Sequence, residues 1–384
     1  MTKHGIRPAG NTEQLNNLKN WLLLRYTPGV GELTFHTLLD AFGTVEAVFD
    51  ASRGQLATLA ISPRVIDALK SETRPDISAD LAWLQQENHH IITLLDEAYP
   101  AQLRELPDAP PVLYVRGDPD YLKQPMLAMV GTRNPTAAGR NTAKEFASYL
   151  SSAGITIISG LASGIDGASH EGALQGMAGT VAVVAHGLDI VYPAHHQQLA
   201  QAIAENGAVI AEMPVGTQLQ RGLFPRRNRL ISALALGTLV VEAAQKSGSL
   251  ITAKYAIEQN REVFAIPGSI HNPMARGCHK LIRQGAKLVE TADDILEELC
   301  VSLKQTASYP EKPAKNPRDN HKDLHQTLDP DHQKLLKCLA YEPASIDELV
   351  RSSNFTAAEI ASMLLILELE GIIICQDGLY TCVS

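Results

Sequence analysis

The sequence predicts an α/β protein in which a helical domain precedes a doubly wound parallel sheet and a winged-helix domain follows it. Three observations support this fold class. The chain of 384 residues is too long for one ordinary domain, and 45% of its residues are hydrophobic, which allows two or three domains with sizeable cores. Short apolar runs alternate with helical segments in the middle part, as is typical of βαβ units. A polar, Pro-rich stretch then precedes a periodic C-terminal segment.

The first domain, residues 1–78, is expected to be helical. Apolar clusters at 21–24 and 35–42 are separated by the turn sequence PGVG at 28–31. This arrangement resembles a sterile-alpha-motif or helix-hairpin-helix bundle, and in the latter the glycine amides of the hairpin contact DNA phosphates. Because Glu32 follows the turn and no basic cluster comes after it, a plain turn between two packed helices is the favoured interpretation.

The second domain, residues 79–300, is expected to be Rossmann-like. Helices should cover both faces of a parallel sheet, and right-handed crossovers should place the loops that follow its strands along one edge. In such sheets the ligand crevice lies beyond the carboxyl ends of the strands. The strands are predicted at 126–131, 155–159, 180–184, 207–211, 238–242, 262–266 and 286–289.

The segment 301–327 holds almost no large apolar side chain and is expected to be a mobile tether. Residues 328–384 regain periodicity and predict a winged helix, with Ser345 and Thr356 as helix caps and a hairpin turn at Asp377–Gly378. Its third helix would carry acidic side chains and no Lys or Arg, so a protein-facing or DNA-neutral role is favoured over base reading. Those acidic residues are Glu359, Glu368 and Glu370.

The overall charge restricts how this chain could bind nucleic acid. With 42 acidic and 33 basic residues, the molecule as a whole repels a phosphate backbone. Any DNA site must therefore be a concentrated patch. The five cysteines show no CxxC pair, so neither a zinc knuckle nor a disulfide framework is indicated. No apolar run is long enough to insert in a membrane and the N-terminus lacks a secretory signal, so the cytoplasm is the expected location.

Four motifs follow predicted strands and would meet in the crevice. They are MVGTRNP from residue 129, SGLASGID from 159, FPRRNRLIS from 224 and VVEAAQKSGSLIT from 240. Gly, Ser and Arg at helix starts are the residues that hold phosphate, and FPRRNR has three arginines with no acid nearby in the sequence. The predicted DNA-binding residues are Arg133, Gly160, Ser163, Gly164, Phe224, Arg226, Arg227, Arg229, Lys246, Ser247 and Ser249.

The crevice lacks the motifs of common cofactor and metal sites. Its first strand is followed by GTRNPTAAG rather than GxGxxG, and no Gly-Lys-Ser or Gly-Lys-Thr follows a strand. Neither a GxSxG elbow nor an HExxH cluster occurs. We therefore expect no cofactor, no metal and no catalytic residue.

Asp166 and Glu242 are candidates for catalysis near the crevice, and His195 and His196 for metal binding, but a structural role is favoured for all four. Asp166 is expected to cap the helix that follows it, and Glu242 to pair with a neighbouring arginine. His195 and His196 are expected to cap or pack a helix, because no third metal ligand accompanies them. The arginines lie on separate loops, which suits successive phosphates of a strand. Phe224, and secondly Tyr192, could stack on bases, although a core role for Phe224 is equally open.

The order of the motifs GTR, SGxAxGID, FPxRNRxIS, VEAxxxSGSLITA and FAIPG resembles the DNA-processing protein A family, also called Smf, over nearly the whole chain. The resemblance implies a protein that binds single-stranded DNA in natural transformation and passes it to the RecA recombinase. It also implies a homodimer, with a dimer and recombinase surface that maps to residues 277–289, although these apolar residues could equally be core. The candidates there are His279, Leu281, Ile282 and Leu288.

Three functions from different classes therefore remain open. The expected one is a single-strand-binding recombination mediator. The alternative is a nucleotide-processing enzyme that uses the same phosphate-binding crevice. The third is a winged-helix transcription factor, which would require specific duplex binding.

Overall fold

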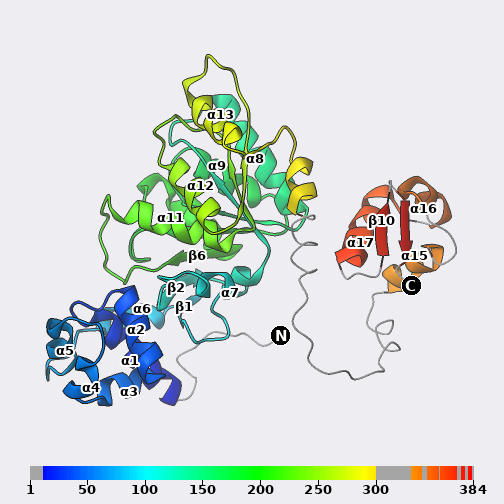
Figure 1. Ribbon diagram of the computed structural model, residues 1–384. Coiled ribbons are helices and arrows are strands. Elements are labelled where there is room, and N and C mark those ends of the chain that lie inside the picture. The colour runs from blue at the N-terminus through cyan, green and yellow to red at the C-terminus, as the bar shows by residue number, and fades with distance from the viewer. Residues whose placement is uncertain are drawn as a thin grey trace. The chain divides into compact units, whose positions relative to one another are not determined.

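The computed structural model describes residues 12–299, 330–339, 344–353, 355–369, 373–376 and 379–382. The chain divides into two compact units, Met1–Ser308 and Tyr309–Ser384 (Figure 1). The predicted tether lies outside the described residues. Among the helices that are described, none has the length and apolar character needed to cross a membrane.

The N-terminal part of the first unit is helical, as predicted. Trp21 packs against Phe35 with ring centroids 5.1 Å apart, and both side chains are buried. Asp80 is also buried and accepts hydrogen bonds from the hydroxyls of Tyr26 and Tyr114, which attaches these helices to the sheet. The kinship with sterile-alpha-motif or helix-hairpin-helix bundles stays a prediction. The helices are α1 (Thr12–Tyr26), α2 (Glu32–Phe42), α3 (Val45–Asp50), α4 (Arg53–Ala57), α5 (Pro63–Leu69) and α6 (Ser78–Leu84).

The sheet of the first unit has the order β1-β2-β6-β5-β4-β3-β7-β8-β9. Each of the seven strands predicted from the sequence is present within a residue or two of its expected bounds. The neighbours from β6 to β9 are all parallel. The strands are β1 (His89–Thr93), β2 (Val112–Gly117), β3 (Met126–Val130), β4 (Thr156–Ser159), β5 (Thr180–Val184), β6 (Gly207–Ala211), β7 (Gly237–Val240), β8 (Glu262–Ala265) and β9 (Lys287–Leu288).

The predicted α/β fold class is confirmed, but the sheet is mixed rather than wholly parallel. β2 pairs antiparallel with β6, and β1 pairs antiparallel with β2. Antiparallel neighbours need no crossover helix, so these two strands fall outside the βαβ alternation from which the other strands were predicted.

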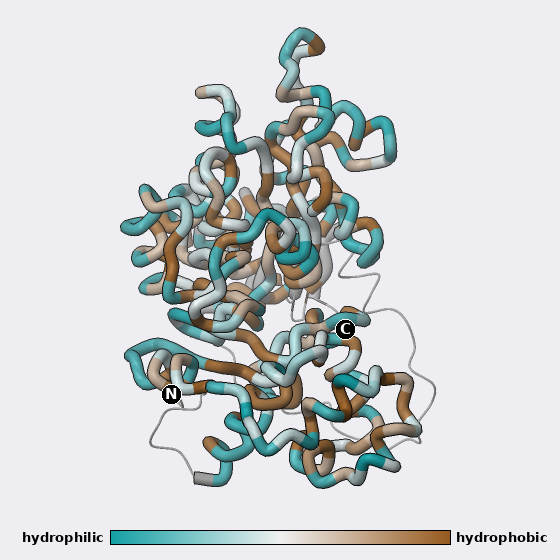
Figure 2. The backbone as a smooth tube through the Cα atoms, turned by 90° about the vertical axis from the view of Figure 1, so that its left-hand side faces the viewer, coloured by the Kyte–Doolittle hydropathy of each residue, from teal (hydrophilic) through white to brown (hydrophobic). Residues whose placement is uncertain are grey.

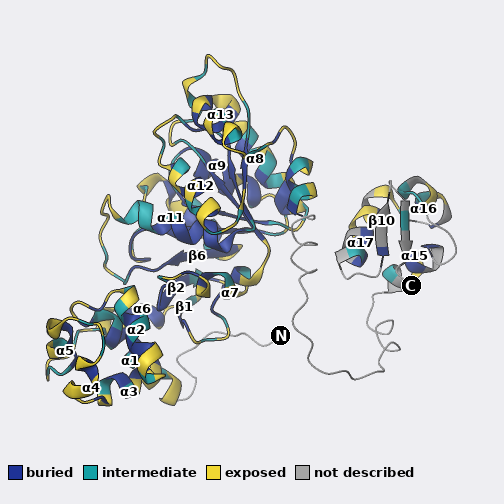
Figure 3. Cartoon of the chain, in the orientation of Figure 1, coloured by how far each residue is buried: buried dark blue, intermediate teal, exposed yellow. Residues whose placement is uncertain are grey.

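Helices cover both faces of the sheet, so the doubly wound arrangement is as predicted. Side chains of β3 alternate between two cores, with Leu127 and Met129 in the core under α8 and α9, and Ala128 in the core under α11 and α12. Figure 3 shows the strands between these helix layers in dark blue, the colour of buried residues. Figure 2 marks the hydrophobic stretches of the same backbone in brown. The helices are α7 (Ala101–Arg104), α8 (Ala137–Ser152), α9 (Ile165–Ala173), α10 (Gln197–Glu205), α11 (Leu223–Leu234), α12 (Ser249–Glu258) and α13 (Arg276–Arg283).

The strand order reverses beside β3, which has β4 on one side and β7 on the other. The chain leaves β3 for β4 through α8, whereas it reaches β7 later through α11. At such a switch point the loops from neighbouring strands separate and leave a crevice. The loops after β3 and β7 therefore border the position where this fold places a ligand.

The second unit has its own core and the winged-helix plan that the sequence predicted. Ser345 and Glu348 form a capping box, and Thr356 accepts a hydrogen bond from the amide of Glu359. The predicted turn at 377–378 and Glu370 lie outside the described residues. The elements are α15 (Pro330–Leu339), α16 (Ile346–Ser352), α17 (Ala357–Leu369), β10 (Ile373–Gln376) and β11 (Leu379–Cys382).

Candidate nucleic-acid interface

Three loops meet at the switch point through backbone contacts. The amide of Thr132, after β3, donates to the carbonyl of Glu242 after β7 over 2.7 Å, and the amide of Ile165 donates to the Thr132 carbonyl over 3.2 Å. Gly164 has a φ of 88°, and a Cβ there would overlap the Thr132 and Arg133 carbonyls. This close approach places Arg133 beside the loop that contains Ser163.

Glu242 holds Thr136, the N-cap residue of α8, and pairs with no arginine among the residues that the structure describes, so the expected arginine pair was wrong. Its carboxylate accepts hydrogen bonds from the Thr136 amide at 2.9 Å and the Thr136 hydroxyl at 2.7 Å, at the start of α8. Gly139 lies so near that a Cβ would overlap the carboxylate. Glu242 therefore fixes the end of the β3 loop, because a negative charge is favourable at a helix N-terminus.

Asp166 does not cap the following helix, contrary to the sequence interpretation. It lies inside the first turn of α9 and accepts hydrogen bonds from the amides of Gly160, at 3.2 Å, and Ala162, at 3.4 Å. Burial raises the pKa of this carboxyl, while Arg227 and the two amides act in the opposite direction. Asp166 therefore holds the SGLASGID loop in shape.

Arg227 is a buried structural residue that bonds to backbone carbonyls, rather than an open phosphate ligand. Its side chain is 5% exposed and donates to the carbonyls of Gly160, at 2.7 Å, and Val183. A Cβ on Gly160 would overlap the guanidinium, so the glycine makes room for it. Burial lowers the pKa of Arg227 to about 10, against the opposing charge of Asp166. One side of Arg227 still lines the crevice.

Arg226 and Arg229 are also engaged by protein groups. Arg226 pairs with Glu32 and with Glu212, the latter at 3.1 Å. Arg229 pairs with Glu212 and, at 3.2 Å, with Asp108. No acid lies near the arginines of FPRRNR in the sequence, but three carboxylates from distant segments reach them in the fold. Two of the three arginines of the FPRRNR motif thus pair with carboxylates of α2, of the loop after α7 and of the segment after β6, and do not line the crevice.

The crevice that remains is a cavity of about 330 Å³ between Arg133, α11 and the start of α12. The guanidinium carbon of Arg133 lies 5.3 Å from the ring centroid of Phe224, and the Tyr192 ring lies 6.2 Å from it. Ser247 and Ser249 line the opposite side with their hydroxyls 2.7 Å apart. Lys246 is exposed on the same loop. The crevice thus joins a cation, an aromatic face and hydroxyl donors.

A second cavity, of about 630 Å³, lies on the other side of Arg133. Ser163 and Gly164, both predicted, line it together with Arg140 and His195, which the sequence interpretation did not include among its DNA-binding residues. From the sequence, Arg140 was expected only to neighbour the arginine motif, because it belongs with Arg133 to the first strand-to-helix unit. His195 contacts Ser163 at 3.3 Å but is exposed, whereas His196 is buried with its Nδ1 3.0 Å from the Leu161 carbonyl, so the predicted packing role is confirmed for His196 alone.

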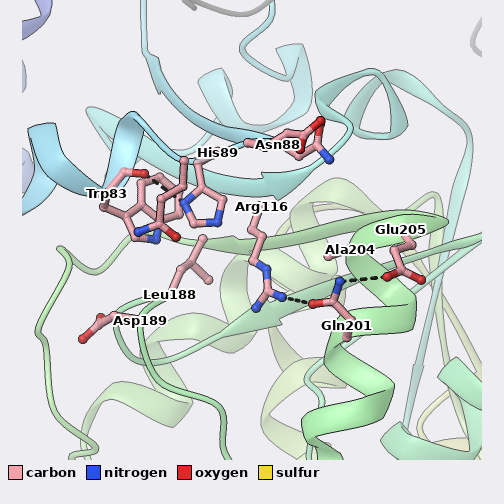
Figure 4. A pocket seen from close by; sticks show the side chains of 11 residues that line it. Trp83, Asn88, His89, Arg116, Leu188, Asp189, Gln201, Ala204 and Glu205 are labelled. Carbon is pink, nitrogen blue, oxygen red and sulfur yellow. Dashed lines mark hydrogen bonds between the residues drawn. The ribbon is translucent and has the colours of Figure 1, made fainter. Parts of the chain in front are cut away.

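A cavity near β1 and α10 has the wrong charge for nucleic acid (Figure 4). Arg116 points into it but donates to Gln201, which in turn donates to Glu205 over 2.8 Å. Glu87, Asp189 and Glu205 outnumber this arginine along the cavity wall. The carboxylates would repel a phosphate backbone.

The predicted dimer surface is divided between core and surface. Leu281 on α13 is only 5% exposed and belongs to the hydrophobic core, which favours the core reading for that residue. Leu288 on the edge strand β9 is 44% exposed, and Ile282 is half-buried. His279 contacts the Gly268 carbonyl at 2.9 Å. Leu288, Ile282 and His279 are thus not part of the buried core.

Comparison with known proteins agrees with the architecture. The family model for DNA recombination-mediator protein A matches residues 90–300, and the DprA winged helix domain matches residues 319–378. Protein Smf of Escherichia coli is 40% identical over 308 residues, which cover 80% of this chain and 81% of that protein.

Two solved structures are also similar. DNA processing protein A of Streptococcus pneumoniae has a TM-score of 0.63 at 36% identity, over 73% of this chain and 97% of its own. The Helicobacter pylori protein, whose structure describes a single-stranded DNA binding mode, has a TM-score of 0.50 at 29% identity, over 56% of this chain and 96% of its own.

Proposed function

The chain belongs to the DNA recombination-mediator protein A family, and from this premise we propose that it binds single-stranded DNA in the crevice between Arg133 and the start of α12. The observation that carries the proposal is the position of Arg133. Its guanidinium is exposed, has no carboxylate partner within the described ranges, and lies over the Phe224 ring. A phosphate and a base of one nucleotide could bind side by side there.

The chemistry of the crevice favours a single strand over a duplex. Phe224 can stack only on a base whose face is free, and in a duplex both faces are covered by neighbouring pairs. Arg133, Lys246 and the hydroxyls of Ser247 and Ser249 would contact the backbone, which carries no sequence information. Binding should therefore depend on charge and vary little with sequence.

The same site supports binding without catalysis. Asp166, which lines the crevice, and Glu242, on the loop after β7, each accept two hydrogen bonds from protein groups that hold loops in place. A general base would need a lone pair directed at the substrate. The proposed role is therefore to hold a strand for another protein, the RecA recombinase, in the cytoplasm during natural transformation.

We further propose that the protein acts as a homodimer through the edge formed by α13 and β9. β9 is the last strand of the sheet, and Leu288 on it is exposed. An edge strand has unpaired backbone groups with which a second copy of the chain can pair, and an exposed apolar side chain adds a contact that such pairing would bury. His279 and Ile282 would lie at the margin of this interface.

Fluorescence anisotropy would test the proposed binding. The probe is an oligo-dT longer than the roughly 4 to 16 nucleotides of a typical single-strand site, compared with its duplex at two salt concentrations. The single strand should bind much more tightly, with a log-log salt slope of about 0.7 for each phosphate contact. Equal affinity for a blunt duplex would contradict the proposal.

A further inference from the structure

The cavity lined by Arg133, Asn134, Arg140, Ser163, Gly164 and His195, here the Arg140 cavity, is separate from the crevice beside Phe224. We propose that the Arg140 cavity is a second phosphate site, which binds a phosphodiester group of the same single strand beyond the nucleotide at Phe224. The inference rests on the proposed function and extends it from one contact to a path.

The charge of the Arg140 cavity is positive and available. Both arginines that line it are exposed, and neither has a carboxylate partner among the residues that the structure describes. Glu171 is the one acidic residue in the described lining, and Lys144 lies 3.8 Å from its carboxylate. Arg226 and Arg229 differ in this respect, because carboxylates already neutralise them. An anion that enters the cavity thus meets two unneutralised guanidinium groups.

The donors around these arginines are held in position before a ligand arrives. The hydroxyl of Ser163 and Nε2 of His195 are 3.3 Å apart, so both polar groups face the same space. His195 packs edge-on against His196 at 4.5 Å, and His196 is fixed by the Leu161 carbonyl. A Cβ on Gly167 would lie 2.8 Å from the His196 ring, so the glycine allows this packing. Fixed donors bind an anion without the cost of ordering them.

The location of the cavity explains why its ligand would be part of a strand. Arg133 lines both the Arg140 cavity and the crevice. The start of α9, with Gly164 before its first turn, adds a positive helix end to the wall. Two phosphate-binding spaces that share one arginine match successive groups of a polymer, whereas a mononucleotide would occupy only one.

The test compares the full-length protein with Arg140→Gln and His195→Gln on labelled oligo-dT of increasing length, from a dinucleotide to about 16 nucleotides. The dinucleotide should bind the variants and the wild type equally, because its single phosphodiester cannot occupy both spaces. Longer strands should bind Arg140→Gln several-fold more weakly, with a salt slope lower by about 0.7 for the one lost contact. Arg64→Gln, which removes the same charge from an exposed position on α5, is the matched control.

Several outcomes would overturn the second site. Equal affinity of Arg140→Gln and wild type at every length would show that the cavity does not contact the strand. Equal loss at every length would place Arg140 in the first site instead. Inorganic phosphate serves as a competitor for the cavity. If phosphate saturably displaces the end of the long strand and Arg140→Gln leaves the strand affinity unchanged, the cavity binds a free anion instead. If the wild type binds no oligonucleotide, the proposed function itself fails, which is a different result.

Discussion

Glu32, in the first turn of α2, forms an ion pair with Arg226 of α11 and so joins the N-terminal helices to the sheet. The pair is part of an alternating network. Arg25 lies 3.0 Å from Glu32, and Glu212 contacts both Arg226 and Arg229. Such a network positions α11, and α11 also carries Phe224 and Arg227. Part of the arginine motif is thus structural, and the proposed DNA contact depends on Arg133.

We expect Arg133→Ala to weaken single-strand binding at least about tenfold without loss of fold. A charge-assisted contact contributes about 1.5 to 3 kcal/mol, and 1.4 kcal/mol corresponds to a factor of ten. Arg133 is exposed, so its loss leaves no buried group unpaired. Anisotropy titration measures the affinity and a urea melt measures the stability. Unchanged binding would place the site elsewhere, and Arg64→Ala controls for net charge.

Arg227→Met should unfold the protein rather than weaken DNA binding selectively. The substitution leaves Asp166 buried without its opposing charge and the carbonyls of Gly160 and Val183 without their donor. Leaving a buried charge and two buried carbonyls uncompensated in this way costs about 3 to 5 kcal/mol. Urea denaturation checks the loss. The double variant Asp166→Asn with Arg227→Met should recover part of the lost stability. If Arg227→Met alone is as stable as the wild type, the buried Arg227 contacts are dispensable.

Glu32→Gln should reduce stability near neutral pH and flatten its decline in acid. Burial raises the pKa of Glu32, but Arg25 and Arg226 outweigh this effect, so the pKa lies below its usual value in the folded protein. Because the pKa of Glu32 is lower in the folded than in the unfolded chain, its ionised form stabilises the fold at pH values above the unfolded-state pKa. This stabilisation is lost as the pH falls through the folded-state pKa. The variant should therefore lose about 1.5 to 3 kcal/mol at pH 7 and converge on the wild type in acid.

Urea denaturation between neutral pH and about pH 3 measures this convergence. Asp40→Asn is the matched control, because Asp40 is an exposed carboxylate on the same helix. If the control changes the profile as much as Glu32→Gln does, the ion pair with Arg226 contributes nothing specific.

The sequence was sufficient for the strands from β3 to β8, because parallel strands buried on both faces appear as continuous apolar runs. β3, with the sequence MLAMV, is buried at every position. β1 and β2 were missed because HHIIT and VLYVRG mix polar with apolar residues and precede the βαβ alternation. A strand is thus predictable from its local sequence only where the apolar pattern continues along the whole strand.

The candidate site was predictable by residue type but not by partner. Gly164, Ser163, Phe224 and Ser247 lie in or beside the crevice because each follows a strand at the same sheet edge. The partners of the arginines could not be inferred, since Glu32 and Glu212 lie in other elements and meet Arg226 only in the folded chain. Ion pairing between distant segments leaves no spacing signal in a sequence.

The last prediction concerns the edge of the sheet. If α13 and β9 form the proposed dimer interface, Leu288→Glu should give a folded monomer. The substitution places a charge at an apolar contact, and each 1.4 kcal/mol of association free energy lost there weakens the dimer about tenfold. Leu281→Glu should instead unfold the protein, since Leu281 is core. Ile257→Glu, at another exposed aliphatic position, should leave the dimer intact. Sedimentation velocity separates these outcomes: a dimer that survives Leu288→Glu, or a wild type that is monomeric, would exclude this edge as the interface.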